Sequence, residues 1–165
     1  MIEKDVLLTM AELAVALAGF SAIIGVLSTR KSSSGLQINS LRLQVMLETC
    51  FMVAVAALIP VLLERFSIAS PVLWRAASAA FLCIAIPYEF VARSRTKGMP
   101  KMTLTKINVN TVNWALSIVA DLILVAILFN LVGAFSEGFY LVALLLQLMV
   151  AGTLFVQFAA ESFTL

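Results

Sequence analysis

Five long apolar runs occupy almost the whole of this 165-residue chain. Each run has about the 20 residues that an α-helix needs to cross the hydrocarbon core of a bilayer. The connections between the runs leave no stretch long enough for a separate soluble domain. The sequence therefore predicts an all-α polytopic membrane protein in which residues 1–165 form one bundle of five transmembrane helices. The expected helices are Val6–Leu27, Leu41–Leu63, Pro71–Ala92, Val109–Val132 and Phe139–Ala160.

Composition also favours a membrane protein over a soluble one. Hydrophobic residues make up 62% of the chain and charged residues 12%, which is about half the charged share of soluble domains. The chain has no histidine, so it lacks the commonest general base and zinc ligand. Cys50 and Cys83 lie inside apolar runs, which is typical of buried thiols rather than of a disulfide framework. We expect no enzymatic activity, no metal and no cofactor.

The positions of Lys and Arg predict the orientation in the membrane, because cytoplasmic connections carry an excess of basic residues. The first and third connections and their flanks hold eight of the eleven basic residues. These eight are Arg30, Lys31, Arg42, Arg93, Arg95, Lys97, Lys101 and Lys106. Five crossings then put the N-terminus outside and the C-terminus in the cytoplasm. The alternative is four crossings, with the first run lying at the interface because Glu12 interrupts it.

The basic third connection lies beside the membrane surface on this topology. Its residues Arg93, Arg95, Lys97 and Lys101 are expected to attract anionic lipid headgroups. The segment has no interleaved aromatic residues and no recognition fold accompanies it, so we expect no nucleic-acid binding. The size and composition of the chain are typical of small bacterial inner-membrane proteins, and we predict that location.

Asp121 is the residue that most restricts the function, because it lies near the centre of the fourth run. A carboxylate at that depth is costly unless it is paired, hydrated or neutralised. It ends a polar series whose members follow at spacings of three and four residues and so share one helix face. The series consists of Asn110, Asn113, Ser117 and Asp121. A series of this kind is strongly unfavourable against lipid, so we expect it to face the interior of the bundle.

Two other runs carry polar residues in the same half of the membrane. Gln44 and Glu48 stand four residues apart in the second run, and Thr153, Gln157 and Glu161 repeat that spacing in the fifth. With the series of the fourth run, they are expected to converge on one polar vestibule on the cytoplasmic side. Carboxylates without a basic residue at the same depth favour cations. The alternative is that these side chains join the helices by hydrogen bonds of about 1 kcal/mol or less each.

The outer half of the membrane holds a second, smaller set of charges. Glu12 in the first run and Arg75 in the third lie at comparable depth and are predicted to form an ion pair that closes the outer side. Small residues also recur every four positions in the first run, a spacing that lets helix backbones approach closely in lipid. They are Ala14, Ala18 and Ala22. The spacing alone does not distinguish a contact within one chain from a contact between subunits.

Two prolines lie inside the second and third runs. Pro60 and Pro87 each remove a backbone donor, which frees the carbonyl groups of Ala56 and Cys83. Neighbouring helices are expected to satisfy these carbonyl groups. Aromatic residues near the run ends are predicted to anchor the chain at the two membrane interfaces. They are Trp74, Phe135 and Tyr140 on the outer side, and Tyr88 and Trp114 on the inner side.

Three functions fit these patterns. The favoured one is a homo-oligomeric ion channel with a cation-preferring vestibule around Asp121, because five helices are too few to surround a wide path. One alternative is a small proton-coupled transporter in which Asp121 is the protonatable group. The other is a non-conducting scaffold or accessory subunit. The expected partners are the lipid bilayer and further copies of the chain, or another membrane protein if the chain is a scaffold.

Overall fold

The computed structural model describes residues 4–29, 36–96 and 109–163, and these form five long α-helices, one short 3-10 helix and no strand. The elements are α1 (Lys4–Thr29), α2 (Leu36–Glu64), α3 (Ser70–Thr96), α4 (Val109–Leu128), η1 (Gly133–Phe135) and α5 (Ser136–Phe163). Each of the five α-helices contains a stretch long and apolar enough to cross a membrane. The prediction of an all-α fold with five membrane-spanning helices is therefore confirmed.

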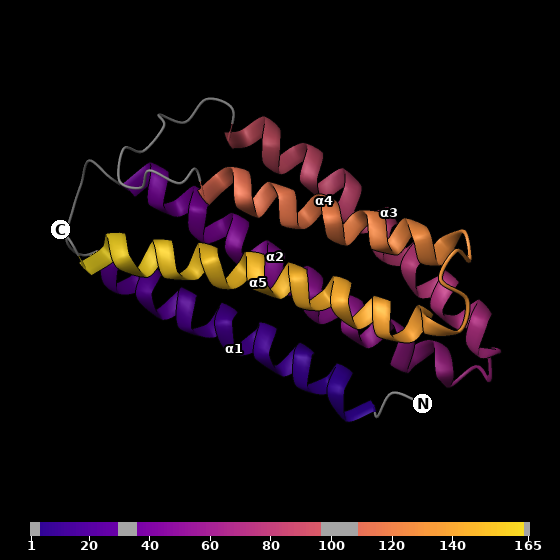
Figure 1. Ribbon diagram of the computed structural model, residues 1–165. Helices are drawn as coiled ribbons and strands as arrows, with labels where there is room; N and C mark the ends of the chain where they lie inside the picture. Colours follow the sequence, from indigo (N-terminus) through magenta and orange to yellow (C-terminus); the bar gives the residue numbers. More distant parts are fainter. Residues whose placement is uncertain (1–3, 30–35, 97–108, 164–165) are drawn as a thin grey trace.

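Consecutive helices run in opposite directions, so the N- and C-termini lie at opposite ends of the bundle (Figure 1). The helices α2, α3, α4 and α5 form a ring in which each contacts the next and α5 contacts α2. The first helix, α1, packs along α2 and α5 on the outside of this ring. It therefore runs along the length of the bundle and does not lie across its end. We call the end that carries Lys4 the N-terminal end and the end that carries Phe163 the C-terminal end.

The ends of α4 and α5 differ from the predicted ones. The fourth helix stops at Leu128 rather than at residue 132, and Asn130 and Gly133 then take positive φ angles of 57° and 53°. Asn and Gly adopt this left-handed conformation more readily than other residues, and it ends a helix. The fifth helix starts at Ser136, whose hydroxyl donates a 2.6 Å hydrogen bond to the carbonyl oxygen of Gly133. Local turn chemistry, which an apolar run does not reveal, sets these boundaries.

The buried face of α1 consists mostly of small residues at spacings of three, four and seven. They are Leu7, Ala11, Ala14, Ser21 and Gly25. A Cβ atom built on Gly25 would lie 2.5 Å from a methyl carbon of Leu43, so glycine here allows α1 to approach α2 closely. Ala22 is exposed. Of the predicted series, Ala14 is thus buried in a contact within one chain, and Ala18 is half-buried.

Large, fully buried side chains fill the centre of the bundle. They are Phe81, Leu124, Ile127, Tyr140 and Leu144. The centroid of the Tyr140 ring lies 5.5 Å from that of Trp74 and 6.5 Å from that of Phe81, distances at which aromatic rings attract one another. This core joins α3, α4 and α5 in the half of the bundle nearer the N-terminal end.

The carbonyl group that Pro60 frees on α2 has a partner on α5. The hydroxyl of Tyr140 donates a hydrogen bond of 2.8 Å to the carbonyl oxygen of Ala56. A neighbouring helix therefore satisfies this group, as the sequence predicted. Because Tyr140 is fully buried, its predicted role as an interfacial anchor is wrong.

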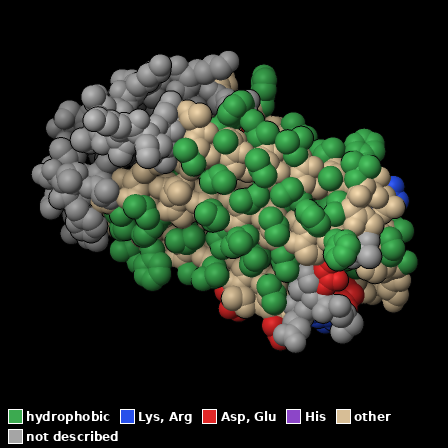
Figure 2. Space-filling model, viewed as in Figure 1, with side chains coloured by type: hydrophobic (Ala, Val, Ile, Leu, Met, Phe, Trp, Pro, Cys, Tyr) green, Lys and Arg blue, Asp and Glu red, His purple; other side chains and the backbone are tan. Residues whose placement is uncertain are grey.

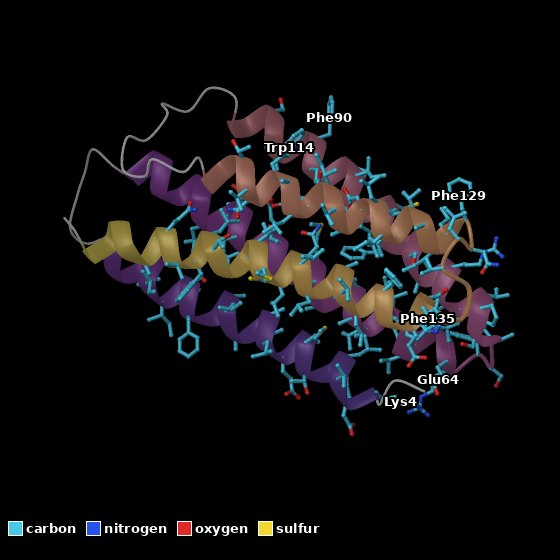
Figure 3. All side chains as sticks on the ribbon, viewed as in Figure 1. Lys4, Glu64, Phe90, Trp114, Phe129 and Phe135 are labelled. Carbon is cyan, nitrogen blue, oxygen red and sulfur yellow. The ribbon has the colours of Figure 1, made fainter. Side chains whose placement is uncertain are left out.

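The other predicted interfacial aromatics divide into two groups. Phe135 and Trp114 are 73% and 47% exposed and lie toward opposite ends of the bundle (Figure 3). Trp74 belongs instead to the buried core. Tyr88 is half-buried, and its hydroxyl donates a 2.9 Å hydrogen bond to the carbonyl oxygen of Val45 on α2. Aromatic residues near a helix end thus include both core and surface positions here.

The outer surface of the bundle is apolar. Large exposed hydrophobic side chains occur on all five helices, among them Phe20, Phe51, Phe90, Leu122 and Val156. On the described part of the face in Figure 2, hydrophobic side chains are spread over the whole surface, while the charged side chains in view lie on the half that carries the N-terminus. A continuous apolar surface of this kind is unfavourable in water and suited to lipid.

Candidate functional site

The polar series predicted on α4 meets polar residues of α5. The hydroxyl of Thr153 donates a 2.6 Å hydrogen bond to Oδ1 of Asn113, which is 6% exposed. Among the described residues, Nδ2 of Asn113 and Nε2 of Gln157 are buried without a hydrogen-bond partner. Ser117 and Gln157 stand one turn further along α4 and α5, on the same sides as Asn113 and Thr153. We call these four residues the α4–α5 seam. It holds buried polar groups whose hydrogen-bonding capacity the described protein groups do not fill.

The series on α4 turns gradually away from the buried face of the helix. A step of four residues advances around a helix of 3.6 residues per turn by about 40°. Asn113 is accordingly buried, while Ser117 and Asp121 are half-buried. The fully buried positions nearby are Ala120, Leu124 and Ile127. Asp121 therefore lies at the edge of the buried face, with its Oδ1 atom buried, rather than at the centre of the bundle.

The polar residues of α2 form a separate group. Nε2 of Gln44 donates a 2.7 Å hydrogen bond to Oε1 of Glu48 on the exposed side of α2. The adjacent Thr49 is buried, and its hydroxyl donates to the carbonyl oxygen of Val45 at 2.8 Å. Tyr88 of α3 donates to the same carbonyl oxygen, so this group joins α2 to α3.

The polar groups described so far therefore lie at two different helix contacts, α2–α3 and α4–α5, and the convergence of Glu48, Asp121 and Glu161 on one vestibule stays a prediction. Glu48 lies on α2, which is across the ring from α4, whereas Asn113 and Thr153 lie between α4 and α5. Spacing along each helix was sufficient to find both groups, but it did not show which helices are neighbours. The side chains of Asn110, Glu161, Arg93 and Arg95, together with Lys97 and Lys101, lie outside the described residues.

The predicted ion pair between Glu12 and Arg75 is not formed. The helix that carries Glu12 packs on α2 and α5, while Arg75 lies on α3 and donates from Nε to the carbonyl oxygen of Leu128 at 3.1 Å. Leu128 is the last residue of α4, where a cation favourably meets an unsatisfied carbonyl group. At this end α1 is joined to α2 by an exposed pair instead, Lys4 Nζ to Glu64 Oε1 at 3.3 Å (Figure 3).

A pocket of about 270 Å³ opens at the N-terminal end, among α1, α2, α3 and α5. Its lining combines apolar and charged side chains, among them Leu7, Pro60, Trp74, Lys4, Glu64 and Glu137. The sequence did not predict this pocket, because its lining comes from segments far apart in the chain that share no motif. It is separate from the α4–α5 seam, which lies nearer the C-terminal end.

One further buried polar residue lies on α5, outside the predicted polar series. Gln147, near the middle of α5, is 4% exposed. Its neighbours at three and four positions on either side are all apolar, so periodicity gives no signal for it. Over the described ranges, no three Cys, Asp or Glu side chains come together as a metal site.

No protein-family model, curated protein or solved structure matches this chain. What the structure shows is a bundle of five helices able to span a membrane, with one polar seam between α4 and α5. A function for the chain therefore has to follow from the chemistry of that seam and of the charges around it.

Proposed function

We propose that this protein conducts cations across a membrane as an assembly of several copies, with the α4–α5 seam as the path from the C-terminal end to Asp121. The observation that supports this best is the pair of buried amide groups, Asn113 Nδ2 and Gln157 Nε2, that have no partner among the described residues. Buried polar groups of this kind are commonly bound to water. Water held along the seam would hydrate a cation on its way to the carboxylate.

The charges of α4 and α5 favour cations over anions. Neither helix contains a lysine or an arginine, whereas Asp121, Glu137 and Glu161 contribute carboxylates. Asp121 lies eight residues beyond Asn113, or about 12 Å along the helix axis. A carboxylate without a basic residue at its depth attracts cations and repels anions.

An assembly is needed because the core of one copy is filled beyond Asp121. Leu124, Ile127 and Tyr140 are fully buried on the side of the N-terminal end. A path that reaches Asp121 has to continue at the surface of the bundle, where a second copy can enclose it. The place of Asp121 at the edge of the buried face of α4 suits such a path. With the basic connections in the cytoplasm, the seam would open toward the cytoplasm.

Cation flux into liposomes that contain the purified protein tests this proposal. We expect flux in the wild type and a change of about tenfold in rate or ion preference on Asp121→Asn, which corresponds to about 1.4 kcal/mol of lost attraction for the cation. The matched control is Asp5→Asn, because Asp5 is the only other aspartate of the chain and is exposed on the first turn of α1. This control variant should leave the flux unchanged.

The other outcomes separate the alternative functions. Equal flux in the wild type and in Asp121→Asn would place the path away from the α4–α5 seam. Flux that saturates with substrate concentration and depends on a proton gradient would favour the transporter. A folded wild-type protein that carries no flux would contradict the channel and favour the scaffold.

A further inference from the structure

Glu12 carries a carboxylate on the outward side of α1. It lies eight residues after Lys4, about 12 Å along the helix axis and within the span Lys4–Val26. Its side chain is exposed, whereas the residues that pack against α2 and α5, such as Ala11 and Ala14, lie on the other side of α1. A charge that faces hydrocarbon at this depth is costly, so the folded protein needs a partner that covers Glu12.

Arg75 has the complementary charge at a similar depth. Of the eleven Lys and Arg residues, two lie within the five spans, and Lys4 stands at the first residue of its span and pairs with Glu64. Arg75 lies five residues inside its span and is exposed. A guanidinium group has five N–H donors, of which the hydrogen bond to Leu128 uses one. Arg75 therefore keeps donors for a carboxylate outside its own chain.

We propose that Glu12 of one copy pairs with Arg75 of the next copy, so that the outward side of α1 docks on the outward side of α3. Within one chain the two residues are kept apart, because α1 lies on α2 and α5 while α3 belongs to another side of the ring. Both helices run from the N-terminal end to the C-terminal end. Two copies with the same orientation in a membrane therefore present the two helices in parallel. Counted from the first residue of each span, Glu12 lies three residues deeper than Arg75, or about 4.5 Å along the helix axis, which the two long side chains can bridge.

The outward residues of the two helices also fall into one register. On α1 they alternate between spacings of three and four: Thr9, Glu12, Ala16, Gly19, Ile23 and Val26. On α3 the exposed or half-buried residues follow similar spacings: Val72, Arg75, Ala79, Cys83, Ile86 and Phe90. When Glu12 is placed opposite Arg75, each residue of the α1 series lies opposite the residue at the same place in the α3 series, within about one residue.

Small residues stand at the middle of this contact. Ala16 comes opposite Ala79, and Gly19 comes opposite Cys83. A Cβ atom built on Gly19 meets no other atom within 4 Å, so this side of α1 is open in a single copy. Small residues at such positions let parallel helices approach closely in lipid. Toward the C-terminal end of α3, Phe90 points away from the bundle and extends the contact (Figure 3).

The two docking faces differ, so each copy offers one donor face and one acceptor face. Contacts of this kind generate a closed ring or an open row rather than a symmetric dimer. The proposed function requires an assembly but does not specify this contact. The contact itself does not require conduction, so a test of assembly can fail while the flux experiment succeeds, or the reverse.

Disulfide cross-linking in the membrane tests the contact. In a Cys50→Ala background, Gly19→Cys is combined with the native Cys83, which is exposed on α3, and the membranes are oxidised with copper phenanthroline. We expect dimers and higher multimers on a non-reducing gel, and their loss on Cys83→Ser. The control is Phe20→Cys, which is exposed at nearly the same depth but lies a quarter-turn around α1. Absence of product, or dimers that persist without Cys83, would overturn the proposal.

A charge exchange tests the ion pair itself. Both Glu12→Gln and Glu12→Lys should lower the yield of the Gly19→Cys cross-link by roughly fivefold or more. Combining Glu12→Lys with Arg75→Glu should restore it. Glu64→Gln is the control, because it removes the exposed pair with Lys4 and should not change the yield. A yield that is insensitive to both Glu12 variants contradicts the pairing, even if the double variant folds poorly.

Discussion

The hydroxyl of Tyr140 lies 2.8 Å from the carbonyl oxygen of Ala56, and this bond links α5 to α2 in the core. It exists because Pro60 cannot donate to that carbonyl group from its own helix. The proline of one helix and the tyrosine of another therefore form one unit. A substitution of one residue should therefore change how much the other contributes to the stability of the bundle.

Tyr140→Phe should lower the stability of the bundle by about 1 kcal/mol, since it leaves a buried carbonyl group without a donor. In a Pro60→Ala background the same change should cost less, because the N–H of residue 60 can then donate to Ala56. Unfolding in a denaturing detergent, measured for the four members of this double-mutant cycle, gives the coupling. Additive effects would show that the two groups are independent.

Asn113→Leu should separate a conducting seam from a structural one. An apolar side chain at this position excludes water from the α4–α5 seam, so cation flux should fall by about tenfold or more if water carries the ion there. Stability should change by about 1 kcal/mol or less, the range of a single interhelical hydrogen bond in lipid. The measurement is liposome flux together with detergent unfolding. A loss of stability without a loss of flux would indicate that Asn113 serves only to join the helices.

Arg75→Met should destabilise the bundle by about 1 kcal/mol, because the carbonyl group of Leu128 at the C-terminus of α4 loses its donor and its favourable charge. Arg75→Lys should restore part of this stability. Unfolding of monomers in detergent measures the effect apart from any contact between copies. As a comparison, Arg65→Met, in the exposed connection after α2, should have little effect.

The orientation can be measured with reporter fusions. A green fluorescent protein fused after Leu165 should fluoresce in cells, and alkaline phosphatase fused after Lys101 should be inactive, because both positions are predicted to be cytoplasmic. Alkaline phosphatase fused after Ser67, in the connection between α2 and α3, should be active. The opposite pattern would mean that the basic connections do not determine the orientation of this chain.

The sequence predicted the helices well and their neighbours poorly. The length of each apolar run indicated the five helices, and residue number along a run gives the position of a charge such as Glu12 or Arg75 along its helix. Whether two charges at one depth share a side of the bundle depends on how the helices are arranged. That arrangement arises from packing between α1, α2 and α5, which leaves α1 away from α3.

The polar residues show the same difference between what spacing along one helix predicts and what packing between helices determines. The spacing of Asn113, Ser117 and Asp121 predicted a series that faces the interior of the bundle, and the rotation of about 40° per step explains why only the first is fully buried. The hydrogen-bond partner of Asn113 is Thr153 on α5, a helix whose own polar residues recur at a spacing of four. The pairing between them could not be predicted, because it depends on the relative rotation of α4 and α5.

The position of α5 has a consequence for how the chain is made. This helix contacts each of the other four and leaves the ribosome after them. Until it inserts, α1 can pack on α2 but not on α5, and the carbonyl group of Ala56 lacks the hydrogen bond from Tyr140. Chains that stop before Ser136 would therefore insert four helices and still lack the element that closes the ring, which makes them natural substrates for membrane quality control.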